Sequence, residues 1–242
     1  MNAIKIEGLT KRYGDVIAVD GLSLCVAEGE IFSLLGVNGA GKTTTIKMLS
    51  CLTTPTDGDA YLLGKSIRKD TAEVKARIAV SPQETAVAPG LSVRENLNLM
   101  CGVHGMTRDH RNAKIQQTAA LLGLEGVMDR KAGKLSGGWQ RRLSIAMAWI
   151  SEPSILFLDE PTLGLDVIAR SDLWEMIRSL KGKATIILTT HYMAEAEALS
   201  DRIAIMKDGK LLVCDTPERI KKMAGTEDFE QAFVRIVKGV AE

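Results

Sequence analysis

The stretch that decides the fold is IFSLLGVNGAGKTT, residues 31–44. Its first part, residues 31–35, is nearly all apolar, which is typical of a buried strand in a parallel sheet. The pattern Gly36-x-x-x-x-Gly41-Lys42-Thr43 follows, and we expect a helix over residues 43–52 after it. Such a loop presents backbone N–H groups to a phosphate, and the helix N-terminus adds positive potential. The stretch therefore predicts a phosphate-binding loop in an α/β fold.

Two side chains of this loop have a chemical task in such a site. Lys42 would reach β- and γ-phosphate oxygens, and the Thr43 hydroxyl would ligate Mg²⁺. The alternative is a glycine turn that only caps the strand. A strand before the loop and a helix after it favour phosphate binding, because that function needs this placement.

The composition argues against several other classes of protein. Of 242 residues, 45% are hydrophobic and 25% are charged, as in ordinary globular proteins. Lysine and arginine number 31 against 30 acidic residues, and a net charge of +1 gives no global field to gather nucleic acid. The scattered Cys25, Cys51, Cys101 and Cys214 predict reduced thiols in the cytosol. No stretch approaches the roughly 20 apolar residues that span a bilayer, so we expect membrane association only through a partner.

Further elements extend outward from the phosphate loop. The first 30 residues are expected to form two short strands joined by a turn, and ARIAVSPQ, residues 76–83, a third strand. Residues 84–152 are predicted to be mostly helical, and Ser92 and Glu95 have the spacing of a capping box. This order predicts a parallel sheet that carries a helical insert.

The second half of the chain returns to buried strands. We expect strands at SILFLDEP, residues 154–161, and ATIILTTH, residues 184–191, with a helix over residues 167–180 between them. RIAIMKDGKLLVC, residues 202–214, predicts a hairpin. The tail, from residue 217 to residue 242, has three apolar residues on one helical stripe. They are Phe229, Phe233 and Ile236.

Two carboxylates follow the strand at residues 154–161. A buried strand that delivers Asp159 and Glu160 at its carboxyl end places them where α/β sheets bind ligands. We expect Asp159 to hold Mg²⁺, directly or through its second shell, and Glu160 to polarise a water against the γ-phosphate. The alternative is a solvated strand end, which the phosphate loop upstream disfavours.

Two further polar residues end strands of the expected sheet. His191 ends a central strand, and we expect it to hydrogen-bond the γ-phosphate and the attacking water. Gln83 follows another strand, and its side-chain oxygen would reach Mg²⁺ and sense the γ-phosphate. Each of these residues, taken alone, is more often structural. The other histidines, His104 and His110, are expected on the surface of the helical insert.

The segment LSGGWQRRL, residues 135–143, places a serine and two glycines at the start of an expected helix. Adjacent glycines there leave backbone amides open to an anion. The alternative is a helix cap softened by glycine. Because the chain already has a better phosphate cradle, the question is which phosphate LSGG serves.

In order and spacing these motifs resemble those of ABC-transporter ATPase subunits, over about residues 2–218. The resemblance implies that Glu160, His191 and Lys42 are catalytic. It implies Mg²⁺ ligands at Thr43 and Asp159 and at Gln83. The residues it implies for ATP binding are Tyr13, Gly36, Val37, Asn38, Gly39, Ala40, Gly41, Lys42, Thr43, Thr44, Gln83, Ser136, Gly137, Gly138, Asp166 and His191.

The resemblance also implies an architecture. The expected fold is an α/β P-loop NTPase with a RecA-like parallel-sheet core, an N-terminal antiparallel β subdomain and an inserted α-helical subdomain. Residues 1–83 and 153–218 would form the core with its β subdomain. Residues 84–152 would form the helical subdomain, and residues 219–242 a helical tail.

The family's mode of action implies an answer to the question about LSGG. Two copies, or this chain and a paralogue, meet head to tail, and Ser136, Gly137 and Gly138 complete the site of the other chain. The expected cofactors are ATP and Mg²⁺, with Asp166 in the loop between the sites. The segments around Gln83 and His191 look like those of exporters whose membrane permease is a separate protein, such as sodium or multidrug efflux systems. The chain would then lie on the cytoplasmic face of the membrane.

The sequence departs from the family pattern at two positions. Val37 stands where proline is frequent, and Trp139 where glutamine or methionine is commoner. Trp139 would either alter a nucleotide contact or pack on a neighbour, and we favour packing. Two other functions remain as alternatives: a soluble member of the superfamily that acts on ribosomes or DNA, and a small-molecule phosphotransferase. The segment between Thr43 and Glu160 is too short for a long coiled coil beside the helical insert, and LSGG has no use in a phosphotransferase.

Overall fold

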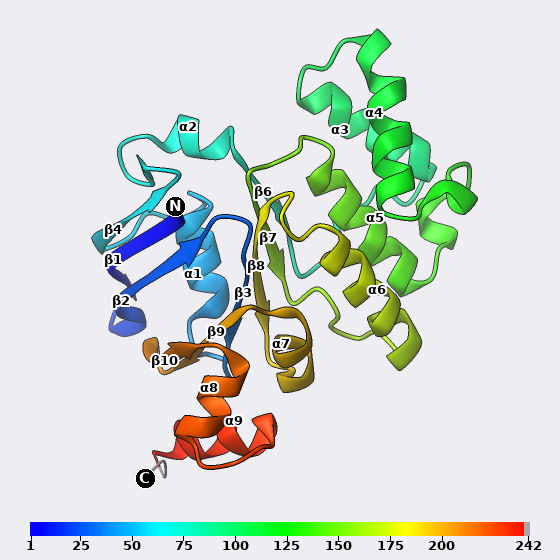
Figure 1. Cartoon of the computed structure of the whole chain (residues 1–242). Helices are drawn as coiled ribbons and strands as arrows, with labels where there is room; N and C mark the ends of the chain where they lie inside the picture. Colours follow the sequence, from blue (N-terminus) through cyan, green and yellow to red (C-terminus); the bar gives the residue numbers. More distant parts are fainter. Residues whose placement is uncertain (240–242) are drawn as a thin grey trace.

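Figure 1 shows the computed structural model of the chain, which describes residues 1–239. Its centre is a sheet in the order β10-β9-β3-β8-β7-β6. The parallel strands are β3 (Ile31–Leu35), β6 (Ile78–Ser81), β7 (Ile155–Asp159), β8 (Thr185–Thr190) and β9 (Arg202–Lys207). The last strand, β10 (Lys210–Asp215), runs antiparallel to β9. The predicted α/β fold and its terminal hairpin are confirmed.

The middle strands of this sheet are buried from solvent. All residues of β3, β7 and β8 are buried, which explains why their sequences are continuous apolar runs rather than alternating ones. The helices α1 (Lys42–Leu49), α5 (Gly137–Trp149), α6 (Val167–Ser179) and α7 (Met193–Leu199) connect the strands. The carboxyl ends of β3, β7 and β8 therefore meet at one edge, where the predicted site residues follow them.

The prediction that α1 runs to residue 52 is wrong. The helix ends at Leu49, and Cys51 then adopts a left-handed backbone with φ of +56°. The amides of Leu52 and Thr53 both turn back to the carbonyl of Lys47, at 2.8 and 3.0 Å. This turn gives donors to the carbonyl of Lys47 near the helix end and stops the helix three residues before the predicted end.

The N-terminal strands form a second, antiparallel sheet. Its order is β2-β1-β4-β5, with β1 (Asn2–Tyr13), β2 (Val16–Ala27), β4 (Asp57–Leu62) and β5 (Lys65–Ser66). The turn between the first two strands was predicted correctly, but the strands are 12 residues each rather than short. Register shifts along their pairing interrupt the alternation of apolar and polar residues. β4, β5 and the short helix α2 (Thr71–Lys75) had no sequence prediction.

The helical insert lies on the far side of the central sheet from the N-terminal sheet (Figure 1). It contains α3 (Val93–Val103), α4 (Arg108–Leu121) and two 3-10 turns, Glu125–Val127 and Ala132–Lys134. The predicted capping box is present: Ser92 Oγ accepts the amide of Glu95 at 3.2 Å, and Glu95 Oε2 accepts the amide of Ser92 at 2.6 Å. His104 and His110 are exposed, as expected.

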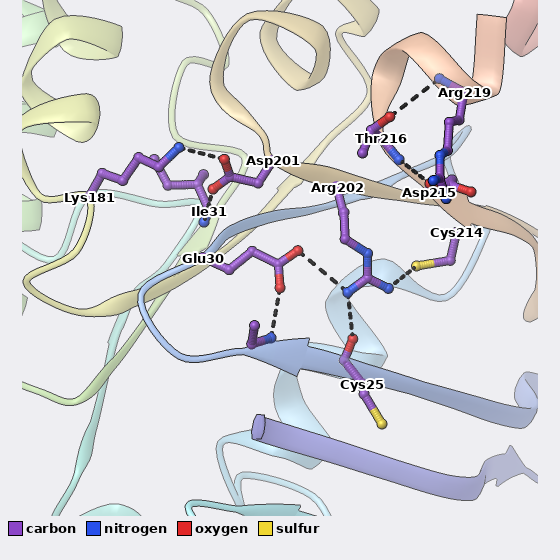
Figure 2. A network of polar contacts seen from close by, with 11 residues as sticks. Cys25, Glu30, Ile31, Lys181, Asp201, Arg202, Cys214, Asp215, Thr216 and Arg219 are labelled. Atoms are coloured by element: carbon purple, nitrogen blue, oxygen red, sulfur yellow. Dashed lines mark hydrogen bonds and ion pairs between the residues drawn. The ribbon is translucent and has the colours of Figure 1, made fainter. Parts of the chain in front are cut away.

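Arg202 joins the N-terminal sheet to the central sheet (Figure 2). It comes from β9 and donates to the carbonyl of Cys25 on β2 at 3.1 Å and to Cys214 Sγ on β10 at 3.2 Å. It also approaches Glu30 Oε1 at 3.5 Å, and the other oxygen of Glu30 accepts the amide of Ala27 at 2.7 Å. One guanidinium thus connects β2, β9, β10 and the loop before β3.

Two helices cover the end of the sheet that carries β10. They are α8 (Pro217–Met223) and α9 (Phe229–Lys238). Phe229 and Phe233 of the predicted stripe are buried against Leu35 and Ile203, and Ile236 is partly buried beside them. The stripe is confirmed, and the end of the predicted tail, residues 240–242, lies outside the described residues.

Candidate functional site

The loop between β3 and α1 is shaped by glycine. Gly41, which caps α1, has φ of +98°. A Cβ at this position would lie 2.4 Å from the carbonyl oxygen of Ala18 on β2, so a larger residue fits neither the conformation nor the space. The first turn of α1 carries no acidic side chain to occupy its free amides. The loop is therefore prepared to receive an anion.

A cavity of about 550 Å³ opens over this loop. Most of the residues predicted to bind nucleotide line it, from the end of β1, the phosphate loop and the segments after β6, β7 and β8. Three residues of β2, which sequence reasoning missed, also line it because the antiparallel hairpin lies beside the loop. The lining residues are Tyr13, Val16, Ile17, Ala18, Asn38, Gly39, Ala40, Gly41, Lys42, Thr43, Thr44, Gln83, Glu160, Leu163 and His191.

Lys42 is a buried cation at the floor of the cavity. Its side chain is 6% exposed, and Nζ donates to the carbonyl of Gly36 at 2.7 Å and of Val37 at 3.3 Å. Burial lowers the pKa of Lys42, and the negative charge of Glu160, whose Oε1 lies 3.6 Å from Nζ, opposes that shift. A phosphate entering the cavity would find a desolvated positive charge held in place by its own loop.

Glu160 stands directly after β7 in a left-handed backbone conformation, with φ of +48°. Its amide donates to both the hydroxyl and the carbonyl of Thr189 on β8, at 3.0 and 3.2 Å, which holds this conformation in place. The carboxylate is buried, and its Oε2 lies 2.7 Å from Nδ1 of His191. The two residues that were predicted from separate strands thus form one hydrogen-bonded pair.

Asp159 faces the phosphate loop from the last position of β7. The hydroxyl of Thr43 lies 3.2 Å from Asp159 Oδ1, and the hydroxyl of Thr189 donates to the same oxygen at 2.5 Å. Gln83 lines the cavity together with Thr43, whereas Asp159 is not among the lining residues. A hydroxyl, a carboxylate and an amide oxygen form the kind of hard oxygen set that Mg²⁺ takes together with phosphate oxygens. These residues fit the expected metal.

The serine and glycines of LSGG lie elsewhere. Ser136 and Gly138 line a separate hollow of about 70 Å³ with Trp139, and Gly137 faces Leu165. Asp166 is also outside the cavity: it caps α6, where its Oδ1 accepts the amide of Ala169 at 2.9 Å. Within the described chain, the LSGG residues therefore lie beside the start of α6, whose N-cap is Asp166, and do not line the cavity over the phosphate loop.

Trp139 packs within its own chain, as predicted. The guanidinium of Arg142, one turn nearer the middle of the helix, lies 5.1 Å from the centre of the indole ring. The ring is also in contact with the apolar core between the helices. A cation above an aromatic face is attractive, which gives this residue a local structural partner.

Sequence reasoning missed two buried residues behind the cavity. Arg141 on α5 is 5% exposed and donates to the carbonyls of Pro82 and Gln83. Glu195 on α7 is fully buried and accepts the indole N–H of Trp174 at 3.1 Å. Burial raises the pKa of Glu195, and the nearby charge of Glu160 adds to that shift. No motif pointed to either residue, because only tertiary packing brings them to the site.

A parallel sheet with a phosphate loop and facing carboxylates at its carboxyl edge defines a P-loop nucleotide-binding protein. The family described as ABC transporter matches residues 19–163. The chain is 42% identical over 219 residues to the Nod factor export ATP-binding protein I of Burkholderia lata, which covers 90% of this chain and 72% of the relative. It is 39% identical to the daunorubicin resistance ATP-binding protein DrrA2 of Streptomyces coeruleorubidus, over 99% of this chain and 76% of the relative.

A longer relative and a solved structure agree with these matches. The chain is 37% identical to the probable multidrug ABC transporter ATP-binding protein YbhF of Escherichia coli, over 97% of this chain but only 41% of the relative's length. A structure described as the ATP binding subunit of an ABC transporter superimposes with a TM-score of 0.84 at 26% identity, covering 97% of this chain and 99% of the other. The chain belongs to the ABC transporter family, and its fold is that of an ATP-binding subunit. In residues 1–239, no helix has the length and apolar character needed to cross a membrane.

Proposed function

We propose that this chain hydrolyses ATP and that Glu160, His191 and Lys42 carry the reaction. The observation that supports this most directly is the chain of contacts from Lys42 through Glu160 to His191, at 3.6 and 2.7 Å, on the wall of one cavity. When ATP binds, Lys42 would move away from Glu160 and neutralise charge on the phosphates. Glu160 would then orient a water toward the γ-phosphorus, with His191 donating to the charge that develops there. The alignment of the water and the terminal phosphate is the main source of the rate.

We propose that Mg²⁺ binds between Thr43, Asp159 and Gln83. When bound, it would supply positive charge that neutralises the phosphates as the bond to the leaving group breaks. The contact between the Thr43 hydroxyl and Asp159 Oδ1 supports this assignment, as does the position of Gln83 in the lining of the cavity. We propose that Tyr13, which is half exposed and lines the cavity, stacks on the adenine ring.

We propose that the active form is a dimer of this chain, or of this chain with a paralogue, with two ATP molecules between the protomers. The separation of Ser136, Gly137 and Gly138 from the cavity of their own chain supports this, because their open amides then serve a phosphate held by the other protomer. ADP lacks the phosphate that bridges the two chains, so hydrolysis would favour separation.

We propose that this cycle drives export through a separate membrane permease, which places the chain at the cytoplasmic face of the membrane. The support is the names of the relatives: Nod factor export, daunorubicin resistance and multidrug transport. We further propose the division into a core of residues 1–83 and 153–218, a helical subdomain of residues 84–152 and a tail of residues 219–242.

The test is phosphate release by the purified chain, with Glu160→Gln as the variant. We expect phosphate release to fall by about 100-fold or more, because a neutral amide cannot accept the proton of the water. ATP binding should persist, and the variant should accumulate as an ATP-dependent dimer in size-exclusion chromatography.

Glu152 provides a matched control. It also has a φ of +48°, but its side chain is exposed and pairs with Lys114 at 2.5 Å, away from the cavity. Glu152→Gln should hydrolyse ATP at the native rate. Native turnover by Glu160→Gln would remove Glu160 from the reaction.

A further inference from the structure

Arg141 connects the helix that begins at the LSGG segment to the segment that carries Gln83. The helix α5 is capped by Ser136 and starts at Gly137, and Arg141 lies one turn further along it. Its guanidinium is buried and donates to two consecutive carbonyls, that of Pro82 at 2.6 Å and that of Gln83. In the proposed dimer, Gln83 serves the ATP of its own chain and the LSGG segment serves the ATP of the other protomer. Arg141 therefore links two segments that belong to different ATP sites.

The chemistry of this contact is unusual for a structural arginine. Burying a cation is costly, and here both hydrogen bonds go to neutral carbonyls. Burial lowers the pKa of Arg141, while the charges of Asp159 and Glu195 attract the guanidinium from further away. An apolar side chain would fill the same space without that cost. What the arginine adds is a rigid fork that fixes two adjacent peptide groups at once.

A second contact supports the same link. Ser144, one turn beyond Arg141 on α5, lies with its hydroxyl 3.2 Å from that of Ser81 at the end of β6. Both hydroxyls are buried. The strand end, Pro82 and Gln83 are thus attached to α5 at two positions one turn apart, so a displacement of either segment carries the other with it.

We propose that Arg141 is a positioning residue that makes Gln83 and the N-terminal turn of α5 move as one body, so that phosphate contact at Gln83 in one ATP site aligns Ser136, Gly137 and Gly138 with the other. This inference rests on the proposed pairing of two chains around two ATP molecules. It identifies the path by which the two sites of a dimer sense each other's occupancy. The path runs through main-chain carbonyls, which is why it depends on the arginine and not on the identity of residue 82.

The test uses Arg141→Lys and Arg141→Met in the full chain. We measure kcat and KM for ATP and the affinity of the monomer for a fluorescent ATP analogue. In the Glu160→Gln background we also measure the ATP concentration at which dimer formation is half-maximal. The cavity and Lys42 are untouched, so we expect monomer affinity within about twofold of native. Both kcat and the tendency to dimerise should fall about tenfold, the size expected when one or two charged hydrogen bonds are lost.

The matched control is Arg178→Met. Arg178 also donates to a main-chain carbonyl, that of Ala198 at 2.9 Å, but it is exposed and this bond joins α6 to α7. It should leave all three measurements within about twofold of native. A double-mutant cycle adds a sharper criterion. If Arg141 acts through Gln83, Arg141→Lys should have little effect on dimerisation in a Gln83→Ala background.

Native kcat and native dimerisation in both Arg141 variants would overturn the proposal, as would an Arg141→Lys effect of full size in the Gln83→Ala background. Loss of the cooperative thermal transition in both variants would assign Arg141 to stability alone and overturn it equally. These results are distinct from a failure of the proposed function. That failure would appear first in the unsubstituted chain, as absent ATP hydrolysis and absent dimerisation of Glu160→Gln.

Discussion

Glu160 combines a strained backbone with a buried carboxylate. An L-residue in the left-handed region costs of order 1 kcal/mol. The amide of Glu160 holds this conformation by donating to both the hydroxyl and the carbonyl oxygen of Thr189. In return, the side chain leaves the end of β7 toward Lys42 and His191 instead of continuing the alternation of the strand. The neighbouring Asp159 keeps the strand geometry and faces Thr43. Two adjacent acids thus obtain different surroundings from one change in backbone direction.

At this same scale, sequence reasoning predicted the identity of most cavity residues but not their contacts. Glu160 and His191 were recognised because each follows an apolar run at the carboxyl end of a strand. Their mutual hydrogen bond depends on the register of β7 against β8, in which Asp159 pairs with Thr189. Register between parallel strands is set by the packing of the whole sheet, so no local pattern reports it. Thr189 was missed for the same reason.

Glu195 should make stability depend on pH. Its folded-state pKa is raised above the ordinary 4.5, so the folded chain binds this proton more firmly than the unfolded chain. Stability should then fall as pH rises from about 4.5 through the folded-state pKa. Glu195→Gln removes this dependence while keeping an oxygen for the indole of Trp174. We expect the melting temperature of the variant, relative to native, to increase with pH by a few degrees between pH 5 and pH 8.

Glu197 is the control for this prediction, because it is on the same helix but exposed and paired with Lys221 at 2.9 Å. The melting temperature of Glu197→Gln relative to native should vary little over that range. A difference for Glu195→Gln that does not change with pH would mean that Glu195 is ionised in the folded chain at all the pH values measured.

Among the helices and strands, the features that depend on neighbouring residues were predicted, and those that depend on distant partners or on an unusual backbone conformation were not. The capping box at Ser92 and Glu95 was predicted and is present, because its hydrogen bonds join residues three positions apart. The end of α1 was misplaced, because the turn at Cys51 uses a left-handed conformation at a residue that gives no such signal. β4 was missed because its sequence begins with Asp and Gly and its partners are only β1 and β5, and β5 was missed because it has only two residues.

The packing of α5 against α6 supplies a test at this scale. A Cβ at Gly138 would lie 2.9 Å from Cβ of Ala169 on α6, whereas a Cβ at Gly137 would meet Leu165 at an ordinary 3.8 Å. Gly138→Ala should therefore lower the free energy of unfolding by about 1–3 kcal/mol through overpacking, and Gly137→Ala should not. Urea denaturation measures both values. Equal stabilities of the two variants would show that the helices separate at no cost.

Over the whole molecule, the N-terminal sheet and the central sheet must keep a fixed relation, because the cavity takes lining residues from both. Ala18 of β2 and Lys42 of α1 face the same space. The contacts of Arg202 in Figure 2 are one polar link between the two sheets, and the amide of Asp20 on β2, which donates to the carbonyl of Gly209 at 2.9 Å, is another. The sequence predicted the order of the elements but not this link, since Cys25 and Arg202 are far apart in the chain and belong to no motif.

Arg202→Met should weaken that relation. The substitution leaves Glu30 buried without its cation and the carbonyl of Cys25 without a donor, which predicts a loss of about 1–3 kcal/mol in the free energy of unfolding. Amides of β2 should exchange faster with deuterium than in the native chain. Arg219→Met is the control, because Arg219 is largely exposed and its pair with Asp215 at 3.6 Å lies at the surface. Unchanged exchange in β2 would show that the other contacts between the two sheets hold them together without Arg202.

The placement of Ser136 and Gly138 in one hollow and of Lys42 in another has an evolutionary consequence under the proposed pairing. After gene duplication, a substitution at Ser136 in one copy would damage only the site built on the Lys42 of its sister. In a dimer of two different copies, a substitution can therefore change one ATP site without changing the other. One site can then lose most of its hydrolytic activity and still hold ATP between the chains, while the other site keeps full activity. A catalytic centre built from a single chain does not allow this division.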